Sequence, residues 1–135
     1  MARKINQSGI YVDAQNLFRL LYCAQFEMDK RDRPVMVTRM FDHTESIISC
    51  FALAYKEDRL AEKRKYIDDM QAHFEALKVL IRMAIDYEMF KKDTTINGAR
   101  ELIVRLSEGM DKWRNSMVLV EHPLGKSDTQ AVSSV

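Results

Sequence analysis

The chain has 135 residues, and its 21 Lys and Arg against 20 Asp and Glu leave a formal net charge of +1. A hydrophobic content of 47% with 30% charged residues suits one folded domain. Only 4 Gly and 2 Pro are available for turns, which argues against a sheet of many strands. No run of about eighteen apolar residues and no signal-peptide pattern is present. We therefore expect a cytoplasmic protein without membrane contact, in which Cys23 and Cys50 are free thiols.

Two helices are predicted in the first half of the chain. Apolar residues three and four positions apart predict a first helix over residues 13–29, with Asp13 as its cap. A basic segment at 30–33 breaks this pattern. Pro34 then suits the first turn of a second helix that ends near Tyr55, because a first-turn residue needs no amide proton for the helix ladder.

Two longer helices follow. Residues 58–89 carry an apolar stripe without Pro or Gly and predict a helix of roughly 45 Å, capped by Asp58. A turn at 91–95 precedes a fourth helix over about 96–117. Gly109 lies beside the apolar face of this helix, where a missing side chain allows a neighbouring backbone to approach closely.

The four helices predict an all-α fold, an antiparallel up-down four-helix bundle, because short connections favour antiparallel neighbours. We expect a flexible N-terminus over residues 1–10, the bundle over 11–118, and a disordered C-terminal tail over 119–135, where Pro, Gly, Ser and Asp replace the periodic pattern.

This topology places the second connection and both chain termini at one end of the bundle. Basic residues outnumber acidic ones there, and the first and third connections bring Lys30, Arg31 and Arg33 near Lys91 and Lys92 at the other end. Both ends are therefore predicted to be basic, and a local excess of positive charge attracts phosphates even when the net charge is small. The competing interpretation is a set of ordinary solvated helix ends. The candidate nucleic-acid-binding residues are Lys56, Arg59, Lys63, Arg64, Lys65, Lys112 and Arg114.

Other charged residues of the third helix are better explained as a solvated face. Glu75 precedes Lys78 by three positions, and Arg82 precedes Asp86 by four, spacings at which opposite charges stabilise an exposed helix. His73 lies at the edge of the apolar stripe, where a packed or hydrogen-bonded histidine is favoured over a metal ligand.

No motif for catalysis, metal binding or phosphate-loop chemistry is present, so we expect no enzyme activity, no cofactor and no metal. Aromatic residues are spread along the helices without the clustering of a base-stacking platform. Tyr22, Phe26 and Tyr87 lie off the main apolar stripes, which favours a homo-oligomer formed through the first and third helices.

About 100 residues resemble a known family. The segment 76–84, a turn with Lys and Thr, and the segment 101–113 look like the second half of the accessory variability determinant (Avd) proteins of diversity-generating retroelements. The similar final helix carries Leu106, Gly109 and Trp113, followed by a basic residue. The first half matches more loosely, as two helices joined by a basic turn that contains proline.

The resemblance implies a four-helix protein that assembles into a pentameric, barrel-like ring and is not an enzyme. Such proteins bind template RNA and a reverse transcriptase, and they support the synthesis of mutagenised complementary DNA. Related four-helix proteins are encoded in ribosomal-RNA intervening sequences. The alternative is a four-helix protein–protein interaction module without nucleic-acid binding. A small-molecule or metal-binding bundle is the least favoured.

Overall fold

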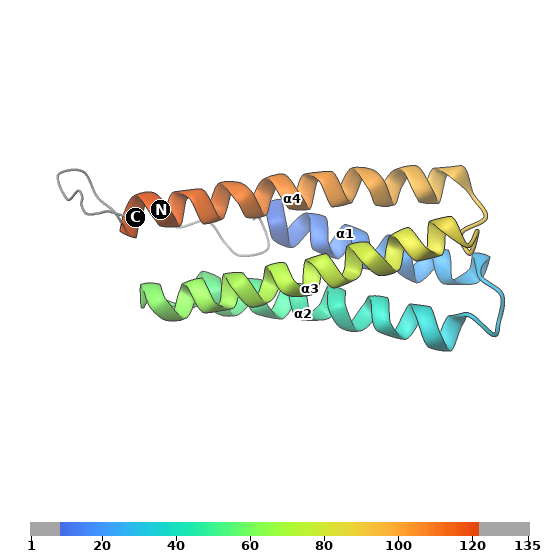
Figure 1. Cartoon of the computed structure of the whole chain (residues 1–135), viewed down its shortest axis with the longest axis horizontal. Coiled ribbons are helices and arrows are strands. Elements are labelled where there is room, and N and C mark those ends of the chain that lie inside the picture. Colours follow the sequence, from blue (N-terminus) through green and yellow to red (C-terminus); the bar gives the residue numbers. More distant parts are fainter. Residues whose placement is uncertain (1–8, 122–135) are drawn as a thin grey trace.

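The computed structural model describes residues 9–121, with side chains to Met117 (Figure 1). Four long helices and two short helical segments follow one another, and this part of the chain contains no strand. The elements are α1 (Gly9–Ala24), the 3-10 segment η2 (Gln25–Glu27), the π-helical segment η3 (Arg33–Val37), α2 (Thr38–Lys56), α3 (Leu60–Asp86) and α4 (Asp93–Glu121).

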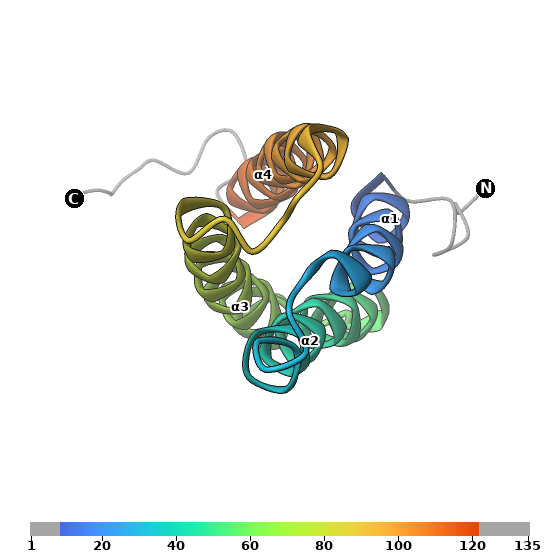
Figure 2. The same cartoon turned by 90° about the vertical axis from the view of Figure 1, so that its right-hand side faces the viewer.

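Consecutive helices run antiparallel, so the α1–α2 and α3–α4 connections share one end (Figure 1). The α2–α3 connection lies at the opposite end with the last turns of α4, and the described part of α1 begins part-way along the bundle. Seen along the bundle, the helices surround one core in the order α1, α2, α3, α4 (Figure 2). The prediction of an all-α antiparallel four-helix bundle is confirmed.

The core is built from the apolar stripes of all four helices. Leu17, Ile47, Leu77 and Leu106, one from each long helix, are 0% exposed. Burying such a side chain contributes roughly 1.5–3 kcal/mol, so the stripes supply the main driving force for packing. No helix in the described range is long and apolar enough to cross a membrane.

The first helix begins earlier than predicted. Asp13 lies inside α1 rather than at its start, is buried, and pairs with Arg105 of α4 at 3.4 Å. The helix extends back to Gly9 because Ile10 continues the apolar stripe and packs on Gly109. A Cβ atom at Gly109 would lie 3.1 Å from Ile10 Cγ1, so a side chain rather than a backbone makes the close approach.

The third helix is also shorter than predicted. It begins at Leu60, and Asp58 makes no side-chain cap. It ends at Asp86 because the next residues turn back: the amide of Met89 donates to the carbonyl of Ala84 at 2.8 Å, and Glu88 adopts a left-handed conformation with φ 58°. This is the hydrogen-bond pattern of a Schellman C-terminus.

The predicted flexible termini lie largely outside the described residues. Of the expected N-terminal segment 1–10, residues 9 and 10 are described and are helical. Of the expected tail 119–135, residues 119–121 are described and form the last turn of α4.

Candidate nucleic-acid interface

The seven predicted cations lie on three helix ends at the same end of the bundle, which we call the basic end (residues 56–65 and 112–114). Lys56 occupies the last turn of α2, and Arg59 immediately precedes α3. Lys63, Arg64 and Lys65 follow in the first turns of α3, while Lys112 and Arg114 lie late in α4. The structure therefore brings together residues that are up to about sixty positions apart in sequence.

Arg59 and Arg114 are engaged in ion pairs. The Arg59 Nε donates to Glu57 Oε2 at 2.9 Å, and a second guanidinium nitrogen donates to Oε1 at 3.2 Å. These side-chain hydrogen bonds, with the Arg59 backbone amide, lower the pKa of Glu57 to about 2. Arg114 pairs across the bundle with Asp68 of α3. The positive charge of both arginines is therefore largely balanced.

Four lysines remain uncommitted. Lys56, Lys65 and Lys112 are exposed and Lys63 is half-buried, and none of them has a carboxylate within 4.0 Å in the described part of the chain. Arg64 is half-buried and has a contact of its own. Ammonium groups on flexible stems that protrude into water suit phosphate contacts, which need charge rather than fixed geometry.

The opposite end, which we call the capped end (residues 25–37 and 87–95), is held by a side chain that the sequence pattern did not reveal. Glu27 Oε1 accepts hydrogen bonds from the backbone amides of Lys91 and Lys92 at 2.9 and 3.0 Å, and Oε2 accepts from Thr95 Oγ1 at 2.5 Å. Partial burial raises the pKa of Glu27, but these hydrogen bonds outweigh it and the net shift is downward.

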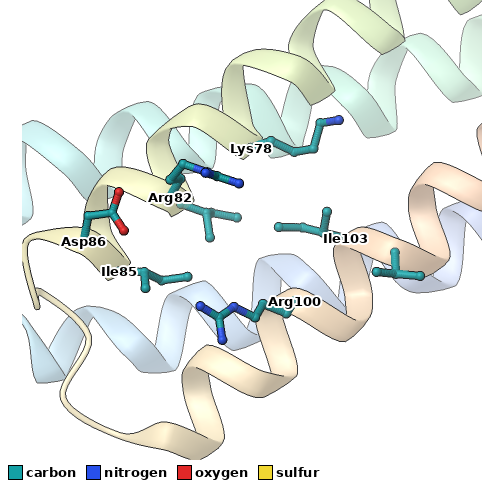
Figure 3. A pocket seen from close by; sticks show the side chains of 8 residues that line it. Lys78, Arg82, Ile85, Asp86, Arg100 and Ile103 are labelled. Atoms are coloured by element: carbon teal, nitrogen blue, oxygen red, sulfur yellow. The ribbon is translucent and has the colours of Figure 1, made fainter.

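A groove of about 450 Å³ separates α3 from α4 on the outer surface (Figure 3). Ile81, Ile85, Ile103 and Val104 supply its apolar lining. Its charged lining consists of Lys78, Arg82, Asp86 and Arg100. The predicted Glu75–Lys78 pair forms at 2.9 Å. Arg82 and Asp86 make no ion pair within 4.0 Å among the described residues, but both are exposed, as expected of a solvated face.

Aromatic rings cluster more than the sequence spacing suggested. Phe18 of α1 stacks on Phe41 of α2 with centroids 4.8 Å apart, and Tyr22 continues the row to Phe26 at 6.1 Å. The Arg33 guanidinium lies 5.7 Å from the Phe26 ring centroid. The rings come from three elements, α1, η2 and α2, which is why no run in the sequence indicated them.

A second long-range contact joins α2 and α3. Nδ1 of His43 and Nδ1 of His73 are 3.1 Å apart and share one hydrogen bond, so His73 is a hydrogen-bonded interior residue as predicted. In the described part of the chain, no three His, Cys, Asp or Glu side chains come close enough together to hold a metal ion. Cys23 and Cys50 are free thiols.

Comparison with known proteins adds no identification: the sequence matches no protein-family model and no curated protein.

Proposed function

We propose that this chain is a non-catalytic accessory protein that binds nucleic acid, as template RNA or complementary DNA, together with the reverse transcriptase of a diversity-generating retroelement. The observation that carries the nucleic-acid part is the group of uncommitted lysines at the basic end, Lys56, Lys63, Lys65 and Lys112. None of these four lysines has a carboxylate within 4.0 Å among the described residues, so their ammonium groups are available to phosphates. The sequence resemblance to Avd proteins supplies the retroelement context and the polymerase partner.

Binding of a fluorescently labelled structured RNA, followed by anisotropy from roughly 50 to 300 mM salt, tests this proposal. Four phosphate contacts correspond to a slope of about −3 to −4 in a plot of log affinity against log salt concentration. Absence of binding at the lowest salt would overturn the nucleic-acid part. Co-purification with the reverse transcriptase encoded beside it tests the polymerase part separately.

Assembly into a homo-oligomer, a pentamer by resemblance, belongs to the same proposal. Tyr22, Phe26 and Tyr87 are 53%, 64% and 67% exposed, more than a monomer needs to leave in water. Sedimentation equilibrium gives the subunit number directly, and a monomer at all concentrations contradicts this part.

The alternative function is a protein–protein interaction module without nucleic-acid binding. One specific observation favours it, the apolar groove between α3 and α4. A bundle that binds only protein would leave the RNA anisotropy unchanged at every salt concentration.

A further inference from the structure

We infer that the α3–α4 groove binds an amphipathic helix with acidic flanks, contributed by a partner protein. The inference does not rest on nucleic-acid binding, because the basic end and the groove share no residue. Its basis is the combination of an apolar floor with basic residues on both walls.

The apolar part of the floor spans about one helical turn of α3, from Ile81 to Ile85. Ile85 of α3 and Ile103 of α4 point toward each other across the groove (Figure 3), and Ile81 and Val104 also line it. The α3 lining recurs at steps of three and four from Lys78 to Asp86, which corresponds to roughly 12 Å along the helix axis. A groove between two helices that lie side by side accepts the ridge of a third helix.

The groove keeps part of its apolar lining in contact with solvent. Val104 of α4 is 55% exposed, whereas Ile81 of α3 is 1% exposed and forms the base of the groove. This arrangement fits the apolar stripe of a helix, which inserts side chains into a groove between two others.

The charges specify the flanks of the partner. Arg82 comes from the α3 wall and Arg100 from the α4 wall (Figure 3), and neither has a carboxylate within 4.0 Å among the described residues. Lys78 is held by Glu75 at 2.9 Å and by the Phe74 ring, 4.9 Å from its centroid. Two uncommitted guanidinium groups on opposite walls match carboxylates on both sides of an apolar stripe.

Designed peptides test this directly with the full chain. The probe is a helical peptide of about 18 residues with a Leu stripe flanked by Glu, and the matched control carries Lys in place of Glu. We expect the Glu peptide to bind at least tenfold more tightly than the Lys peptide in fluorescence anisotropy. Equal binding of the two peptides would overturn the charge argument.

Charge reversal in the protein completes the test. The double variant R82E/R100E should lose at least tenfold in affinity for the Glu peptide and gain affinity for the Lys peptide. The double variant R31E/R39E, which reverses two exposed arginines outside the groove, should bind like the original protein. Equal loss in both variants contradicts the proposed site, and unchanged circular dichroism verifies the fold of each.

Two further measurements test the contribution of the apolar floor and the possibility that a second copy of the chain occupies the groove. Val104→Ser should weaken both peptides because it removes exposed apolar surface without changing charge. If R82E/R100E instead dissociates an oligomer in sedimentation and neither peptide binds, a second copy of the chain occupies the groove and the inference is wrong.

Discussion

The two ends of the bundle differ in how their charges are arranged. The capped end has five basic and five acidic residues, whereas the basic end has seven basic and three acidic residues. At the capped end, Glu27 connects η2 to the start of α4 through bonds that span 64 to 68 positions. At the basic end, the Glu57–Arg59 pair spans two positions and the Asp68–Arg114 pair spans 46, but neither engages a lysine. The capped end therefore has balanced charge and a hydrogen-bond network around Glu27, whereas the basic end keeps an excess of positive charge.

The largest expected effect on stability is at the capped end. Glu27→Ala removes the hydrogen bonds from the amides of Lys91 and Lys92, just before α4, and from Thr95 in its first turn. We expect a loss of about 2 kcal/mol in the free energy of unfolding. Urea denaturation measures it. Glu108→Ala, at an exposed site of α4, is the matched control and should change stability little. Equal losses would show that Glu27 is not a cap.

The pH dependence of stability also tests the role of Glu27 at the capped end. The pKa of Glu27 is lowered in the folded protein, so its contribution is complete above the ordinary glutamate pKa and disappears as the pH falls through the lowered value. The difference in stability between the original protein and Glu27→Gln should therefore be constant near pH 7 and shrink below about pH 4.5. A difference that grows on acidification contradicts the assignment.

A smaller effect, an increase in stability, is expected at the α3–α4 turn. Glu88 has φ 58°, a conformation that glycine adopts without steric cost. Glu88→Gly should stabilise the protein by about 0.5–1 kcal/mol, and Glu88→Ala should not. Thermal unfolding followed by circular dichroism distinguishes the two variants. A lower midpoint for the glycine variant would contradict the left-handed geometry.

The smallest effect on stability is expected at the basic end. The Arg59 side chain is 75% exposed, and ion pairs with so exposed a partner contribute little to stability. Arg59→Ala should leave the thermal midpoint unchanged, while the pKa of Glu57 rises from about 2 toward its ordinary value. A carboxylate titration by NMR follows that shift, and an unmoved pKa would exclude the pair.

The sequence predicted the bundle because the apolar stripes of the four helices repeat at helical spacing, from Leu17 in α1 to Leu106 in α4. It misplaced the helix starts, since these depend on partners distant in sequence. The packing of Ile10 on Gly109 extends α1 toward its N-terminus. The hydrogen bonds that Glu27 accepts just before α4 accompany a helix start three residues before Ile96. Glu27 lies near the end of the first predicted helix, and nothing in the surrounding sequence indicates that it hydrogen-bonds to the start of another helix.

The sequence predicted which end of the bundle carries the lysines, but not the features that depend on contacts between helices. Up-down topology sufficed to place Lys56, Lys63 and Lys112 at one end of the bundle. It did not show that Asp68 of α3 pairs with Arg114 of α4. Nor did it reveal the α3–α4 groove, because the apolar floor and the two free arginines come from separate helices.

The salt dependence of RNA binding in two matched variants tests the central claim most directly. One reverses the uncommitted lysines of the basic end (K56E/K63E/K65E/K112E), and the other reverses four exposed cations outside the basic end (R19E/K30E/R31E/R39E). The first should flatten the slope by about 3 and weaken binding on the order of a hundredfold, and the second should change the slope by less than about 1. Equal flattening in both variants, or a larger effect in the second, would contradict the assignment of the basic end.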